Sequence, residues 1–194
     1  MSLPADDPVL QSLLKTADPT PFDDVAFRVI PGAQVLLNLH FEHLWAGTGA
    51  GRCNPKGVQR LYMSIERETA IAEFNYYEEK AGLDPQVSDW YSFAARVRLA
   101  RVLDLRQAKT RSHVGLTLKE ICEEWESDPL HPSIDPTRLQ AIGYWISKGY
   151  GNFSAIVCRS ARRKTGHNIV IFAGRVTSPD LVDPISRKPT QGWP

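Results

Sequence analysis

Hydrophobic and polar residues alternate along this chain with two different periods, which together predict both strands and helices. Between residues 94 and 105 the period is two, with apolar side chains at every second position and mostly arginine or aspartate between them. This alternation predicts a half-exposed strand, and Arg101 breaks it. Further short strands are predicted at Val25–Ile30, Arg60–Ile65, Ser154–Cys158 and Asn168–Phe172.

Residues 66–81 predict a helix, because they are rich in helix-forming residues and contain neither glycine nor proline. Ser64 is expected to cap this helix, and Glu78 and Glu79 to lie on its exposed surface. The buried stripe is expected to comprise Ala70, Phe74, Tyr77 and Ala81. Glu73 borders that stripe, where a carboxylate loses hydration unless a partner compensates for it. Glu73 is therefore a candidate functional residue, and a structural salt bridge explains its position equally well.

Two capping patterns predict further helices. Thr117 and Glu120 form a capping box, and Asp135 followed by Pro136 is typical of a helix start. Strands that cluster along the chain with only partial helical alternation indicate an α+β fold. We expect a single domain with a mixed or antiparallel central sheet and flanking helices.

Composition and charge mainly exclude classes of function. With 194 residues, 42% apolar and 23% charged, the chain is long and apolar enough for one globular domain. A net charge of +1 gives no overall field that would attract nucleic acid or anionic lipid. We find no apolar run of membrane-spanning length, no signal-peptide pattern at the start and no CxxC spacing among the three cysteines. A cytoplasmic protein without nucleic-acid or membrane binding is expected.

Candidate chemistry concentrates between residues 45 and 73. The loop 45–57 holds four of the thirteen glycines, and Arg52 lies within it. Tyr62 follows on the next predicted strand and Glu73 on the next helix. A cation, an aromatic ring and a carboxylate suit a ligand with phosphates, a flat ring and a ribose, which a dinucleotide combines. The glycines alone are weak evidence, because the lysine and hydroxyl residue of a P-loop are missing.

Three other features of the sequence bear on function. His40 and His43 lie three residues apart, but no third ligand stands at a recognised spacing, so no metal is expected. The basic run 159–164 is typical of a solvated loop. Ser160 within it follows an apolar strand directly, and side chains at strand ends often contact ligands.

These motifs, in this order, resemble the RES-domain family, which is named for its arginine, glutamate and serine. The matching segments are Phe27-Arg28, Gly51-Arg52-Cys53-Asn54-Pro55, Leu61-Tyr62-Met63-Ser64, Ala70-Ile71-Ala72-Glu73, and Ser160-Ala161-Arg162 before Asn168–Phe172. Cys53 departs from the pattern, which usually has tryptophan there. The resemblance divides the chain into a lead-in of residues 1–24, a RES domain of residues 25–175 and a tail of residues 176–194.

The resemblance implies an ADP-ribosyltransferase-like fold and NAD as substrate, without a metal. It implies a toxin that is silenced by an Xre-type antitoxin, a helix-turn-helix protein, plugged into the active site. The implied activity is cleavage of the nicotinamide–ribose bond of NAD with water or phosphate as acceptor; the alternative is protein ADP-ribosylation. A non-catalytic protein-binding module with a structural ion-pair network stays open, as does a homodimer.

The resemblance also implies roles for individual residues. Glu73, Tyr62 and Arg52 are expected to be catalytic, and Arg28, Arg52, Tyr62 and Ser160 to bind NAD. In this interpretation Arg28 and Arg52 hold the pyrophosphate, and Tyr62 stacks on the nicotinamide or orients its amide. Ser160 is expected to hydrogen-bond a phosphate or Glu73 itself.

Overall fold

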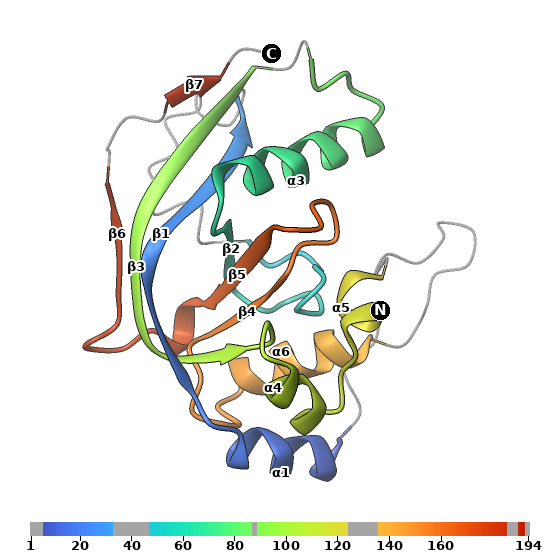
Figure 1. The fold of residues 1–194 in the computed structure, drawn as a ribbon, viewed down its shortest axis with the longest axis vertical. Coiled ribbons are helices and arrows are strands. Elements are labelled where there is room, and N and C mark those ends of the chain that lie inside the picture. Colours follow the sequence, from blue (N-terminus) through green and yellow to red (C-terminus); the bar gives the residue numbers. More distant parts are fainter. Residues whose placement is uncertain (1–5, 33–46, 87–88, 124–135, 186–189, 193–194) are drawn as a thin grey trace.

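The computed structural model describes residues 6–32, 47–86, 89–123, 136–185 and 190–192 (Figure 1). The helices are α1 (Pro8–Thr16), α3 (Arg67–Lys80), α4 (Ala108–His113), α5 (Leu118–Cys122) and α6 (Arg138–Ser147), with a 3₁₀ turn, η2, at Ala173–Arg175. The strands are β1 (Thr20–Pro31), β2 (Arg60–Ser64), β3 (Trp90–Asp104), β4 (Ala155–Arg159), β5 (His167–Phe172), β6 (Leu181–Pro184) and β7 (Thr190–Gly192).

The strands form one sheet in the order β1-β2-β5-β4-β3-β6, and β7 also pairs with β3. An additional pairing between β1 and β3 closes the path from β1 to β3 into a ring. Strands β3 and β4 run parallel, and the other pairings between described strands are antiparallel. The prediction of an α+β domain with a mixed sheet is confirmed. The predicted tail contributes β6 and β7 to this sheet.

Each face of the middle strands β2, β5 and β4 carries its own hydrophobic core. One face meets β1 and β3 in a cluster that includes Phe22, Leu61, Met63, Val97, Val157, Ile169 and Ile171. The other face meets the helices in a cluster that includes Leu10, Leu14, Ile142, Ile146, Ile156, Val170 and Phe172. Figure 1 shows α3 above these strands, α1, α4 and α6 below them and α5 to their right. Because successive side chains along a strand point to opposite faces, each of these strands contributes residues to both cores.

The broken alternation at Arg101 has a structural cause. The register between β1 and β3 shifts between Thr20 and Phe22, which pair with Val102 and Leu99 respectively. The extra residue in β3 allows both Leu99 and Val102 to be buried. The Arg101 guanidinium turns outward and donates to the backbone carbonyl of Arg175. It also donates to the side chains of Asn152, Thr177 and Asp180.

Two predicted helix starts are wrong and one is confirmed. Helix α6 begins at Arg138 with Thr137 as its N-cap, so Pro136 lies before the helix; Asp135 lies outside the described residues. The Thr137 hydroxyl accepts from the Gln140 amide while the Gln140 side chain binds back, and this reciprocal box prevails over the Asp-Pro pattern. The predicted capping box of α5 is present at Thr117. Helix α3 begins at Arg67, so Glu66 instead of Ser64 occupies its N-cap position, without a capping side-chain hydrogen bond.

The buried face of α3 also differs from the prediction. Ala70 and Phe74 are buried as expected, but Tyr77 is 45% exposed and Ala81 is exposed as well. Glu78, expected at the surface, is only 8% exposed. The inward stripe therefore follows positions i, i+4 and i+8 instead of i, i+4 and i+7. Both spacings fit an amphipathic helix, so local periodicity does not distinguish them.

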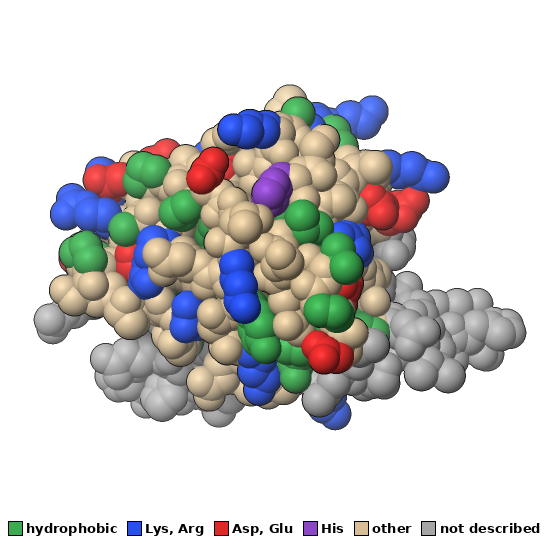
Figure 2. All heavy atoms as spheres, turned by 90° about the horizontal axis from the view of Figure 1, so that it is seen from below, with side chains coloured by type: hydrophobic (Ala, Val, Ile, Leu, Met, Phe, Trp, Pro, Cys, Tyr) green, Lys and Arg blue, Asp and Glu red, His purple; other side chains and the backbone are tan. Residues whose placement is uncertain are grey.

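Surface charge agrees with the near-neutral composition. On the face drawn in Figure 2, Lys and Arg side chains lie apart from one another among acidic and apolar residues. In the part of the chain that the structure describes, no helix is long and apolar enough to cross a membrane.

Candidate functional site

The structure brings four of the five predicted site residues around one cavity. The cavity has a volume of about 440 Å³, and Arg28 of β1, Arg52 of the glycine-rich loop, Tyr62 of β2 and Glu73 of α3 line it. The fifth, Ser160, lies directly behind Glu73 and contacts its carboxylate. The volume falls in the range of small-molecule sites, about 300–1,000 Å³.

Glu73 is held by two hydrogen-bond donors on the same oxygen. Its Oε1 accepts from Ser160 Oγ at 2.7 Å and from Asn168 Nδ2 at 2.6 Å. Ser160 Oγ in turn accepts from the backbone amides of Arg162 and Arg163, at 3.0 and 3.2 Å. Of the two roles expected for Ser160, the contact with Glu73 is therefore the one present in the structure. Sequence reasoning missed Asn168, a polar residue at the start of an apolar strand.

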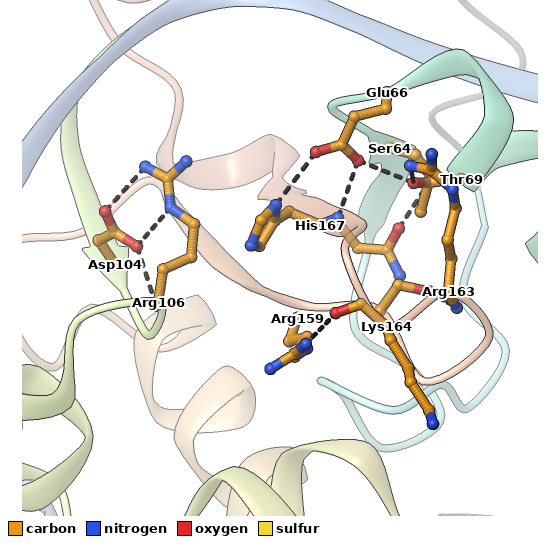
Figure 3. A network of polar contacts seen from close by, with 11 residues as sticks. Ser64, Glu66, Thr69, Asp104, Arg106, Arg159, Arg163, Lys164 and His167 are labelled. Carbon is orange, nitrogen blue, oxygen red and sulfur yellow. Dashed lines mark hydrogen bonds and ion pairs between the residues drawn. The ribbon is translucent and has the colours of Figure 1, made fainter.

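A separate polar network fixes the start of α3 against β5 (Figure 3). The Glu66 carboxylate accepts from the His167 backbone amide at 2.9 Å and from Thr69 Oγ1 at 2.8 Å, and pairs with His167 Nδ1 at 3.0 Å. Burial raises the pKa of the Glu66 carboxyl, but the hydrogen bonds from His167 and Thr69 outweigh it and lower the pKa overall. Because His167 adjoins Asn168, this network also fixes the distance between Asn168 and α3.

The loop that carries Arg52 is preorganised by Tyr62. The Tyr62 hydroxyl accepts from the Cys53 amide at 2.9 Å and donates to Asn54 Oδ1 at 2.8 Å. Gln140 of α6 donates to the Gly51 carbonyl at 2.8 Å. Burial, with a further contribution from Cys53, raises the pKa of Tyr62 well above its ordinary value. Tyr62 therefore stays protonated and anchors the loop, while its ring contributes to the cavity wall.

Arg52 connects the cavity to α5. Its side chain is buried, and Nη1 donates to the carbonyls of Ile121 and Glu123 at 3.0 and 2.8 Å. A guanidinium has five donors, so these two bonds leave others for a ligand. Phosphate binding by Arg52 stays a prediction, with loop anchoring as an additional role.

Arg28 has a neighbouring arginine in the cavity, Arg60, which was not among the predicted site residues. Arg28 and Arg60 both line the cavity, and Arg60 also lies 5.4 Å from the centre of the Tyr62 ring. Burial, followed by the charge of Arg60, lowers the pKa of Arg28 to about 10. Arg60 remained unnoticed, although it precedes Tyr62 by two residues and must share its face of β2. Neighbouring guanidinium groups in a partly desolvated cavity favour an anionic ligand.

Close packing of Gly143 in α6 against the Arg52 loop yields a testable prediction. A Cβ at this position would overlap the Cys53 carbonyl oxygen. Gly143→Ala is therefore expected to push the loop away and to reduce the free energy of unfolding by on the order of 1–3 kcal/mol, the usual cost of overpacking. Urea denaturation measures the effect. Gly174→Ala is the control, because a Cβ there meets open space; an equal loss in both variants would contradict the packing argument.

Cys53, which departs from the RES pattern, is fully buried with its Sγ 3.9 Å from that of Cys158. The hydrogen bond with Cys53 and burial raise the pKa of the Cys158 thiol well above its ordinary value. Cys158 is thus a poor nucleophile, since the thiolate is the reactive form. Within the described ranges, no group of three or more His, Cys, Asp or Glu side chains is placed to hold a metal. His40 and His43 lie outside the described residues.

The protein is thus a mixed-sheet domain with a cavity that is lined by arginines and by a hydrogen-bonded carboxylate, a lining suited to an anionic small molecule. The chain belongs to the RES domain family, whose family model matches residues 25–193. The resemblance predicted from the sequence is confirmed. No curated protein matches the chain.

Among solved structures, a chain in the crystal structure of the M. tuberculosis MbcT–MbcA toxin–antitoxin complex has the same fold, with a TM-score of 0.69 and 16% sequence identity. The match covers 96% of this chain and 93% of that chain. At this identity the likeness shows the fold.

Proposed function

We propose that this protein is a toxin that cleaves the nicotinamide–ribose bond of NAD with water or phosphate as acceptor. The observation that carries the proposal is the Glu73 carboxylate, held by Ser160 and Asn168 at the wall of a cavity that also presents Arg28 and Arg52. The arginines suit the pyrophosphate and the carboxylate suits the ribose. Membership of the RES domain family supports NAD as the substrate.

The chemistry follows from charge. Loss of nicotinamide leaves an oxocarbenium-like cation on the ribose, as in glycoside hydrolysis. The Glu73 carboxylate, fixed through Oε1, stabilises that cation electrostatically without having to reorganise. Arg28 and Arg52 bind the pyrophosphate through charge-assisted hydrogen bonds. Nicotinamide departs as a neutral molecule, so a strong general acid is not required.

The test is release of nicotinamide from NAD by the purified protein, with and without inorganic phosphate. Production of ADP-ribose indicates water as acceptor, and a phosphorylated ADP-ribose indicates phosphate. Label transfer from NAD to protein instead would favour the ADP-ribosyltransferase alternative. Unchanged NAD under all conditions would rule out the proposal and leave the non-catalytic binding module.

The proposed partner is an antitoxin that occupies the cavity. The MbcT–MbcA structure is that of a toxin bound to its antitoxin, which supports a partner of the same kind here. A carboxylate at the end of the partner's chain would suit the guanidinium groups of Arg28 and Arg52. A plug of this kind excludes the dinucleotide directly, so no conformational switch is required.

Competition tests the plug. We expect a non-hydrolysable NAD analogue to weaken antitoxin binding in calorimetry. We also expect Arg28→Gln to bind the antitoxin more weakly than the wild type when no analogue is present. Arg98→Gln is the control, because Arg98 is exposed on β3 and pairs with Asp23. Simultaneous binding of analogue and antitoxin at full affinity would contradict the plug.

A further inference from the structure

We propose that Asn168 is a positioning residue for Glu73, and the proposal rests on the function proposed above. The amide of Asn168 sets the rotation of the Glu73 carboxylate, which leaves the second carboxylate oxygen for the ribose cation. Asn168 does not touch the substrate in this assignment; it acts through Glu73.

The first support is the geometry at Glu73. Both donors, Ser160 Oγ and Asn168 Nδ2, contact Oε1, at 2.7 and 2.6 Å. Two bonds to one oxygen from different directions restrict rotation of the carboxylate. Among the described residues, Oε2 has no hydrogen-bond partner, and it is the oxygen that remains for a ligand.

The second support is the orientation of the Asn168 amide. Ser64 Oγ donates to Asn168 Oδ1 at 2.8 Å, and the amide nitrogen consequently faces Glu73. The reverse orientation would place an amide oxygen against a carboxylate oxygen, two acceptors without a proton between them. Ser64 thus donates to Asn168 and Asn168 to Glu73, so this chain of hydrogen bonds ends on the carboxylate.

The third support is the rigidity of the platform. Asn168 lies on β5, opposite Ser64 of β2 on one side and Cys158 of β4 on the other. Only 4% of Ser64 and 8% of Asn168 is exposed. Groups on paired strands hold a catalytic side chain more accurately than groups on loops. Ser160, two residues after Cys158, supplies the other donor to Glu73.

The test replaces the donor by an acceptor of nearly the same shape. In Asn168→Asp, two carboxylates face each other at hydrogen-bonding distance without a proton between them, and these like charges repel. At pH 7.5 we expect kcat for NAD cleavage to fall by on the order of tenfold to a hundredfold, with a smaller change in KM. Towards pH 5 the introduced carboxyl gains a proton and becomes a donor, so activity should recover in part.

The wild-type pH profile is the control for every other group around Glu73. These groups are Tyr77 and Glu78 on α3, Arg28 on β1, Arg52 and Cys53 in the glycine-rich loop, Arg60 and Tyr62 on β2, Cys158, Arg162 and Arg163 on or after β4, and His167 on β5. All are present in both proteins. Recovery at low pH that occurs in the variant alone therefore reports the introduced carboxyl.

Ser64→Ala decides the matter if Asn168→Asp does not fold. It leaves the Asn168 amide without its orienting donor, and we expect kcat to fall several-fold with little change in melting temperature. Ser154→Ala is the matched control, a buried serine that bonds the Arg101 carbonyl. Wild-type kcat and pH profile in both site variants would overturn the role of Asn168. Absence of NAD cleavage by the wild type would overturn the proposed function instead.

Discussion

Replacing Glu73 by glutamine is expected to lower nicotinamide release from NAD by on the order of a hundredfold or more, as with other electrostatic stabilisers of a transition state. The glutamine carbonyl oxygen can accept from Ser160 and Asn168 as Oε1 does. Shape and hydrogen bonding are thus retained, and only the negative charge is removed. A steady-state assay of nicotinamide release measures kcat, which should fall more than KM rises, because the charge acts on the cation of the transition state.

Glu79→Gln provides the matched control for this experiment. Glu79 lies on the same helix, is exposed and does not line the cavity, so its neutralisation should leave kcat unchanged. Melting temperatures of both variants show whether each is folded. Turnover close to that of the wild type in Glu73→Gln would exclude the carboxylate from the mechanism.

Much of this architecture could be predicted locally. Period-two alternation indicated the strand over residues 94–105, and the apolar edge of a helix indicated that Glu73 is unusual. Helix α4 went unpredicted because its sequence, AKTRSH, has no apolar stripe and buries none of its residues. The N-cap of α6 was misplaced because two capping patterns stand two residues apart.

The missing site residues depend on long-range pairing. Asn168 contacts Ser64 because β5 pairs with β2 in a register that places these two residues opposite each other. The sequence of either strand alone does not determine this register. Likewise, the carbonyls that bind Arg52 belong to the last turn and the C-cap of α5, about seventy residues further along the chain. Such contacts arise from tertiary packing and leave no local periodicity to detect.

The dual position of Arg52 leads to the second large effect. Arg52→Lys retains the charge but loses the planar fork that can bind a phosphate while also binding the Ile121 and Glu123 carbonyls. We expect kcat/KM for NAD to fall by on the order of tenfold to a hundredfold, since hydrogen bonds to charged groups contribute roughly 1.5–3 kcal/mol each. Nicotinamide riboside, which has the same glycosidic bond and no phosphate, should be cleaved with a much smaller loss.

The comparison between the two substrates separates phosphate binding from loop anchoring. If Arg52 only anchored its loop to α5, the lysine variant would displace the cavity wall and impair both substrates equally. If it also binds pyrophosphate, the penalty falls on NAD. Arg98→Lys, on the exposed face of β3, should affect neither substrate. An equal loss for NAD and the riboside in Arg52→Lys would assign pyrophosphate binding to Arg28 and Arg60, whose guanidinium groups also line the cavity.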